Sequence, residues 1–253
     1  MKRERLTLIN GELIEAIPAF LAKGRGNETR RLLATHEYLL RRKADGRFLA
    51  VASGSRFRLL LRNTSTQHQC ETFLGNNVFS EAGSIKSVQA MLDFLGVSDE
   101  YGNQHDLILT PEPSTLSFAG FDRYQRPLWM QENAGKAWLA MQYAALMNGV
   151  RLEAISGYRG HAYQFGIFKR KLARGQSVQE ILKVNAAPGF SEHHSGRAID
   201  IGTPNEPAAE ESFENTTAFA WLKDHAPGFG FRLSYPRNNP HDIVYEPWHW
   251  YFV

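Results

Sequence analysis

Residues 191–200 read SEHHSGRAID, and this stretch decides how the C-terminal half of the chain is expected to fold. Within 198–201, isoleucines alternate with Ala and Asp, a period of two that is typical of a half-buried strand. Such a strand buries its isoleucines and presents Asp200 beside the preceding histidines, while Gly196 supplies the bend. An imidazole and a carboxylate can then reach one metal ion.

A further ligand is expected from EPWHW at 246–250. Catalytic zinc takes three protein ligands and keeps one position open. Glu246 and His249 lie three residues apart, and Pro247 between them removes a hydrogen bond from a strand ladder. Strand pairing is therefore expected to be irregular here, which would let both side chains reach one cleft.

Peptide hydrolysis also needs a proton acceptor and a cation beside the metal. Glu246 is spare in the ligand count, so it suits a general base that later protonates the leaving amine. Arg159, in SGYR at 156–159, is the best candidate for stabilising the developing oxyanion or the substrate carboxylate.

Three motifs now stand in order: SGYR at 156–159, SxHxxGxAxD at 191–200 and ExWH at 246–249. Together they resemble the VanY-type D-alanyl-D-alanine carboxypeptidases of the LAS group of zinc peptidases, over roughly residues 117–253. The resemblance implies a zinc cofactor. It assigns three metal ligands (His193, Asp200 and His249), the catalytic base (Glu246) and the transition-state or carboxylate clamp (Arg159).

The resemblance also points to substrate-binding residues. Gln164 matches a substrate-binding glutamine of the family, and Ser191 matches its motif serine. We expect Tyr158 and Trp248 to line the pocket as aromatic neighbours of the motifs. His194 directly follows the proposed ligand His193, so either member of the pair remains a candidate. His241, beside Asp242, is the other histidine to be considered near the site.

Each motif alone has an ordinary structural explanation. His249 lies between two tryptophans and would suit an aromatic core, and Arg159 would suit a surface ion pair. Gln164 would be equally at home on a solvated helix face. The co-occurrence of three ordered motifs favours the metal site, although similar ligands also hold other divalent first-row metals.

Composition excludes several classes of function. The net charge is a mild +3, and the basic residues are spread along the chain instead of forming one block. This distribution argues against a nucleic-acid partner. Cys70 is the single cysteine, so neither an intramolecular disulfide nor a cysteine-ligated metal is expected. The first twenty residues lack a signal-peptide core, and no membrane span is apparent, so we expect a cytoplasmic protein.

The first part of the chain, 1–116, is expected to be a small α+β region of unknown role. Helical spacing predicts a pair of helices over 12–23 and 28–43, and a further helix from Ser84. FLAVAS (48–53) and RFRLLLRN (56–63) flank Gly54 and predict a hairpin. The region could cover the cleft, recognise glycan or mediate assembly.

The second part, 117–253, is expected to be the VanY-like peptidase domain, with a boundary near Thr115 marked by turn residues. Helices are predicted over 133–149, with Asn133 as cap, 161–175 and 216–226, and strands over 151–156, 198–201, 229–236 and 243–253. The fold class is therefore α+β: an antiparallel sheet flanked by helices carries the monozinc site, with the N-terminal α+β region added.

The resulting hypothesis is a zinc metallocarboxypeptidase acting on peptidoglycan-derived peptides. Because a cytoplasmic enzyme meets soluble muropeptides, we favour an L,D-carboxypeptidase that trims tetrapeptides during cell-wall recycling. The alternatives are D,D-carboxypeptidase activity on D-Ala-D-Ala termini and a phage-type endopeptidase whose N-terminal region binds wall polymer. A non-catalytic binding module is disfavoured because the ligands and the base are all present. Oligomeric state is left open.

Overall fold

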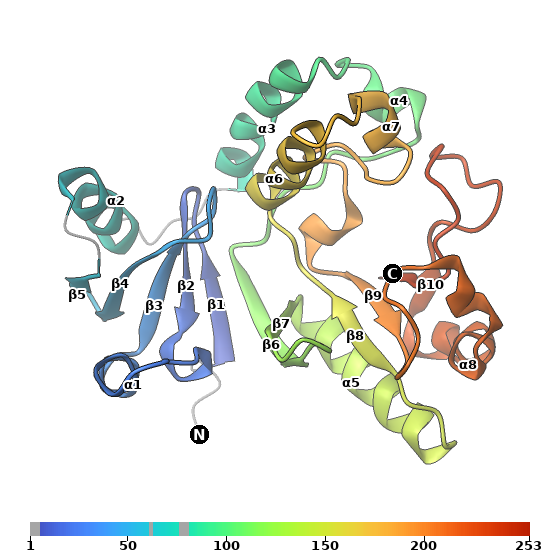
Figure 1. Ribbon diagram of the computed structural model, residues 1–253, viewed down its shortest axis with the longest axis horizontal. Coiled ribbons are helices and arrows are strands. Elements are labelled where there is room, and N and C mark those ends of the chain that lie inside the picture. Colours follow the sequence, from blue (N-terminus) through green and yellow to red (C-terminus); the bar gives the residue numbers. More distant parts are fainter. Residues whose placement is uncertain (1–5, 61–62, 76–80) are drawn as a thin grey trace.

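The computed structural model describes residues 6–60, 63–75 and 81–253 and contains two antiparallel sheets (Figure 1). Within these residues, the larger sheet has the order β5-β4-β3-β2-β1-β6-β7 and the smaller one β10-β11-β9-β8. The larger sheet comprises β1 (Thr7–Asn10), β2 (Ile14–Pro18), β3 (Tyr38–Arg42), β4 (Phe48–Ser53), β5 (Arg56–Leu59), β6 (Thr115–Phe121) and β7 (Pro127–Met130). The smaller sheet comprises β8 (Glu153–Ser156), β9 (Ala198–Gly202), β10 (Phe231–Leu233) and β11 (His249–Phe252).

Helices pack around both sheets. The α-helices are α1 (Asn27–Thr35), α2 (Thr64–Gly75), α3 (Glu81–Leu95), α4 (Tyr101–Gln104), α5 (Glu132–Met147), α6 (His161–Leu172), α7 (Val178–Leu182) and α8 (Thr217–His225). Short 3-10 helices are η2 (Ala19–Leu21), η3 (Glu192–Ser195), η4 (Glu211–Asn215) and η5 (Ala226–Phe229). Among the described helices, none is long and apolar enough to cross a membrane.

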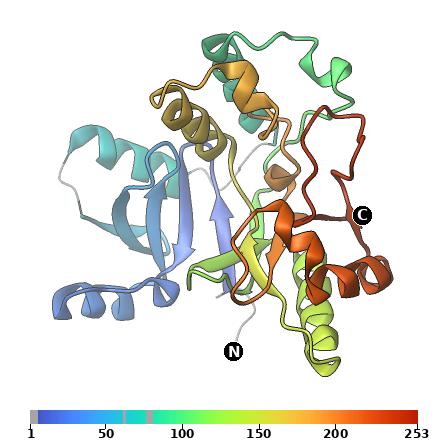
Figure 2. The same cartoon turned by 45° about the vertical axis from the view of Figure 1, so that its right-hand side comes forward.

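The helices of the C-terminal part gather at two ends of the small sheet. Figures 1 and 2 show α3, α6 and α7 side by side above one end of β9, where they share a buried cluster that includes Val88, Phe168 and Ile181. At the other end, α5 and α8 pack against the sheet in the largest core cluster, which includes Trp138 and Leu222. The candidate motifs lie on the strand ends between these helical layers.

The predicted α+β class with antiparallel sheets and flanking helices is confirmed. Helices α3, α5, α6 and α8 lie where helical spacing places them, and β4 and β5 form the expected hairpin, although its residues 61–62 lie outside the described ones. One detail differs: Gln131, not Asn133, precedes the first residue of α5.

The predicted helical pair near the N-terminus is wrong. Residues 14–18 form β2, all of whose residues are buried, and 38–42 form β3; only 27–35 is α-helical. Residues 14–19 are buried without a break, and the spacing of so short a buried run does not separate a helix from a strand. Pairing with β1 and β3 decides in favour of the strand.

Strand β9 also differs from expectation, since all five of its residues are buried and it is not half-exposed. The predicted alternation of faces is nevertheless present. Ile199 and Ile201 belong to the main core cluster, while Asp200 faces His193 on the opposite side. That side is covered by protein, which places the acidic side chain in an enclosed site.

The domain division at 116/117 stays a prediction. Strand β6 passes through this point and pairs with β1, so that Leu8 lies opposite Leu116. The N-terminal strands and β6–β7 therefore share one continuous sheet (Figure 1).

Candidate active site

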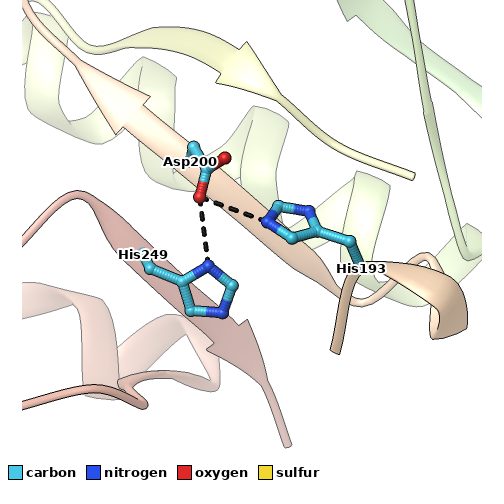
Figure 3. Close-up of side chains that lie close together, drawn as sticks. All are labelled: His193, Asp200 and His249. Atoms are coloured by element: carbon cyan, nitrogen blue, oxygen red, sulfur yellow. Dashed lines mark hydrogen bonds and ion pairs between the residues drawn. The ribbon is translucent and has the colours of Figure 1, made fainter. Parts of the chain in front are cut away.

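Two of the proposed ligands face each other across the small sheet. Strand β11 pairs antiparallel with β9, and His249 is the direct partner of Asp200 in that register. His249 Nδ1 lies 3.0 Å from Asp200 Oδ1 (Figure 3). The pairing of these strands brings together side chains 49 residues apart in sequence.

The third ligand, His193, comes from η3, immediately before β9. Gly196 ends η3 with a φ of +70° and turns the chain into the strand. A side chain there would be strained by this backbone and would collide with Leu116. The turn leaves His193 Nε2 3.2 Å from Asp200 Oδ1, the oxygen that also faces His249.

The hydrogen bonding of His193 fits a metal ligand. Its Nδ1 lies 2.7 Å from the carbonyl oxygen of Gly157, which only accepts, so Nδ1 carries the ring proton. Burial, followed by the charge of Arg159, lowers the pKa of His193 to about 4, although Asp200 opposes this. The neutral ring therefore presents a bare Nε2 that has no hydrogen-bond partner among the described residues.

A cation between these atoms would resolve an unfavourable contact. The lone pairs of His193 Nε2 and Asp200 Oδ1 face each other over 3.2 Å. One ligand atom from each of the three residues lies within 4.8 Å of the others, and all three residues are buried. Two imidazoles and one carboxylate are a common zinc-binding set.

His249 is held from both sides. Its Nε2 lies 2.9 Å from Glu192 Oε2, and its Nδ1 faces Asp200. Burial lowers the pKa of His249, but the two carboxylates outweigh it and raise the pKa to about 10. Metal binding at Nδ1 would displace its proton, while the bond to Glu192 would keep the ring oriented.

Glu246 lies beside the three ligands without belonging to the cluster. Its Oε2 is 3.9 Å from His249 Nδ1, in a turn in which His249 N donates to Glu246 O. Burial raises the pKa of Glu246 to about 7; Asp200 adds to this, whereas His249 and Arg159 oppose it. A carboxyl group whose pKa lies near neutrality suits acid–base exchange.

Arg159 and Gln164 line the same cleft as the ligands. Arg159 is fixed through its backbone N–H, which donates to His193 O over 3.2 Å, while its buried Nε has no partner in the described part of the chain. Gln164 is buried on α6; its Nε2 donates to Ala186 O, and its Oε1 is likewise unpartnered. Together they offer a charged donor and a polar amide to a ligand in the cleft.

The other predicted site residues divide into two groups. Ser191 is buried and lines the cleft, and its role in substrate binding stays a prediction. Tyr158 and Trp248 are not among the residues that line it. The Tyr158 hydroxyl donates instead to Glu112 Oε2 over 2.8 Å, and Trp248 packs against the main core cluster.

The geometry favours His193 over His194 as the ligand. His194 Nε2 accepts from Gly189 N, and its Nδ1 lies 2.6 Å from the carbonyl oxygen of Arg159, so both ring nitrogens are engaged. His241 faces the carbonyl oxygen of His105, and Asp242 pairs with the His105 ring. Neither His241 nor Asp242 lines the cleft.

Sequence reasoning missed three residues of the site. Glu192 holds His249, Tyr235 stacks near it with ring centroids 4.7 Å apart, and Asn185 lines the cleft. The position of Glu192 inside the histidine motif was the available signal. For Asn185 the signal was its place at the start of NAAPGFSEH (185–193), the stretch that leads into the histidine motif. Tyr235 lies in a segment without a motif, and only the folded chain brings it to the cleft.

The chain is similar to known proteins in sequence and in fold. A family model described as VanY, D-alanyl-D-alanine carboxypeptidase, matches residues 127–253. The chain is 29% identical over 200 residues to YodJ of Bacillus subtilis (strain 168), covering 76% of this chain and 72% of YodJ. It is 28% identical over 155 residues to VanXYC of Enterococcus gallinarum, named a bifunctional D-Ala-D-Ala dipeptidase and carboxypeptidase, covering 59% of this chain and 79% of that protein.

One solved structure shares the fold over much of its length. The LdcB LD-carboxypeptidase superposes with a TM-score of 0.53 at 31% identity, covering 58% of this chain and 71% of LdcB.

Proposed function

This chain belongs to the VanY family of carboxypeptidases in the LAS group of zinc peptidases, and from that premise we propose that it is a zinc-dependent L,D-carboxypeptidase. Its proposed substrates are tetrapeptide muropeptides, from which it releases the terminal D-Ala. The observation that carries the proposal is the enclosed cluster of His193, Asp200 and His249 beside Glu246. The cytoplasmic location stays a prediction.

Zinc is the proposed cofactor because the bare His193 nitrogen and the Asp200 oxygen face each other beside His249. When bound, zinc would lower the pKa of a coordinated water to roughly 7 and polarise the scissile carbonyl. His193, Asp200 and His249 would hold it, and Glu192 would orient His249 through Nε2.

The remaining residues supply proton transfer and substrate binding. Glu246 accepts the proton of the attacking water and passes it to the leaving amine of D-Ala. The raised pKa of Glu246 favours both steps, because the group exchanges a proton readily near neutral pH. The unpartnered Nε of Arg159 is available to the terminal carboxylate, and Gln164 and Ser191 provide polar contacts in the same cleft.

Similarity to LdcB supports cleavage between an L-centre and D-Ala. D,D-carboxypeptidase activity is the second candidate, because VanXYC acts on D-Ala-D-Ala and the family model carries that description. Both reactions use the same ligands and base. They differ in the chirality of the residue before the scissile bond, so substrate choice must separate them.

Mass spectrometry of reaction products tests the proposal. Zinc-loaded protein is incubated with tripeptide, tetrapeptide and pentapeptide muropeptides, alongside Glu246→Ala and the exposed control Glu210→Ala. We expect the wild type and the control to convert tetrapeptide to tripeptide, and Glu246→Ala to fail. Conversion of pentapeptide to tetrapeptide alone would assign D,D-specificity, and no release of D-Ala from any peptide would overturn carboxypeptidase activity.

A further inference from the structure

A buried carboxylate joins the N-terminal strands to the candidate site. Glu112 is 2% exposed and lies between the two parts of the chain. From the N-terminal side, Lys43 Nζ forms an ion pair with Glu112 Oε2, and Asn10 Nδ2 donates to the same oxygen over 3.0 Å. Lys43 is itself fixed by donation to Gly11 O over 3.1 Å.

On its other side, Glu112 binds the segment that carries Arg159. Its Oε2 accepts from the Tyr158 hydroxyl over 2.8 Å, and its Oε1 accepts from His161 N, the first residue of α6, over 2.7 Å. Asn10 Nδ2 also lies 2.8 Å from the Tyr158 hydroxyl. Glu112 therefore holds the residues one before and two after Arg159.

These contacts continue to the metal ligands. The His161 ring meets the His194 ring edge-on, with centroids 4.4 Å apart, and His194 Nδ1 donates to Arg159 O over 2.6 Å. The Arg159 N–H in turn donates to His193 O. The backbone of Arg159 is thus fixed on one side by the histidine motif and on the other by Glu112.

We propose that Asn10, Lys43 and Glu112 are positioning residues for Arg159, so that the N-terminal region serves substrate binding by holding the SGYR segment. The inference rests on the proposed function, in which Arg159 contacts the terminal carboxylate of the substrate. Lys43 compensates the buried charge of Glu112, and Glu112 fixes the direction of Tyr158 and the start of α6. Loss of Lys43 is expected to shift Tyr158 and the start of α6, and with them Arg159, while the zinc content shows whether the metal ligands stay in place.

The test measures peptide binding to the full-length, zinc-loaded protein. The Glu246→Gln variant prevents turnover, and calorimetry compares a D-Ala-terminated tetrapeptide with the same peptide as its C-terminal amide. In the Glu246→Gln background we expect preferential binding of the free acid. Adding Lys43→Met should reduce this preference about tenfold or more, because Arg159 is displaced from the carboxylate. Lys43→Arg should restore it in part.

Matched variants separate positioning from general stability. Arg42→Met removes the same charge at the neighbouring residue, whose guanidinium binds Asp45 in the turn, so it should leave the preference unchanged. If Lys43→Met does not fold, Lys43→Met/Glu112→Gln removes both buried charges, and Tyr158→Phe removes only the hydroxyl contact. Each should lower the acid-to-amide preference at full zinc content.

An unchanged preference in folded, zinc-loaded Lys43→Met and Tyr158→Phe would overturn the inference, as would an equal loss of affinity for acid and amide. Release of D-Ala by the wild-type protein then leaves the proposed function intact. If the wild type neither binds these peptides nor releases D-Ala, the proposed function and this inference fall together.

Discussion

Asp200 Oδ1 faces two imidazoles at once, and the hydrogen bonds made elsewhere by each ring determine what this oxygen can bind. His193 gives its proton to Gly157 O and turns a bare nitrogen toward Asp200, whereas His249 turns Nδ1 toward the same oxygen. A divalent cation satisfies all three ligand atoms. A cation bound here would compensate the charge of Asp200. The hydrogen bonds that orient the two imidazoles therefore help to determine the chemistry of the site.

Removal of one ligand should abolish metal binding. We expect His193→Ala to reduce zinc from one ion per chain to near zero, because two remaining protein ligands do not complete a catalytic site. His194→Ala is the informative comparison, since both of its ring nitrogens are engaged elsewhere and it should keep its zinc. Elemental analysis after dialysis measures the content, and the reverse pattern would move the ligand assignment to His194.

Glu192 should set the affinity for zinc without being a ligand. Its Oε2 lies 2.9 Å from His249 Nε2 and so fixes which nitrogen faces the cluster. We expect Glu192→Gln to weaken zinc binding about 10- to 100-fold, the usual cost of losing such an orienting partner. Competition with a chromogenic chelator measures this, with Glu210→Gln as an exposed control. Unchanged affinity would show that strand pairing alone orients His249.

At the scale of elements, the turn between η3 and β9 depends on Gly196. Its φ of +70° disfavours other residues, and a methyl group there would meet Leu116 and the backbone of Gln131. We expect Gly196→Ala to lower the free energy of unfolding by about 2–4 kcal/mol, combining backbone strain with the collision. Urea denaturation measures it.

Gly175 provides the matched control for this turn. Its φ is +88°, but none of the described residues outside its chain neighbours lies within 4 Å of an added methyl group. Gly175→Ala should therefore cost only the backbone strain, about 1–2 kcal/mol. If both variants lose the same free energy of unfolding, Leu116 moves aside from the added methyl group at little cost. Close packing at the turn would then not be what holds His193 in place.

The elements that could be predicted from sequence are those with a clear local pattern, such as helical spacing over α5 and α8. Strand β9 was recognisable from alternation, and the resemblance of three ordered motifs implied the ligands that lie on and beside it. Strand β2 was not, because IEAIP is buried on both faces and its partner strands supply the missing information. The hydrogen bond of Glu192 to His249 likewise depends on the pairing of β9 with β11, which no local pattern specifies.

At the scale of the whole molecule, the N-terminal region is joined to the rest by a shared sheet and a buried ion pair. Leu8 of β1 lies opposite Leu116 of β6, and Lys43 reaches Glu112. The turn residues that precede 116/117 favour a division of the chain at that point. Turn residues mark a break in regular structure, but they do not tell whether the next strand rejoins the same sheet.

This junction should make the stability of the whole chain sensitive to acid. Burial raises the pKa of Glu112, but the charges of Lys43 and His161 and their hydrogen bonds outweigh it and lower the pKa to about 2, from 4.5. A lowered folded-state pKa stabilises the protein above pH 4.5, and this stabilisation is lost as the pH falls toward 2. Between pH 7 and pH 3, Glu112 should account for about 2 kcal/mol of lost stability.

Urea denaturation of the wild type and Glu112→Gln at both pH values isolates this contribution from those of other carboxylates. The variant should be less stable at pH 7, because Lys43 loses its buried partner, and should lose about 2 kcal/mol less than the wild type on moving to pH 3. Unfolding followed by tryptophan fluorescence and by far-UV circular dichroism should show one coincident transition, since Trp129 shares a buried cluster with Leu8 and the shared sheet couples both parts. Equal pH dependence in the two proteins would mean that Glu112 is not charged against Lys43, and the junction would then depend on strand pairing alone.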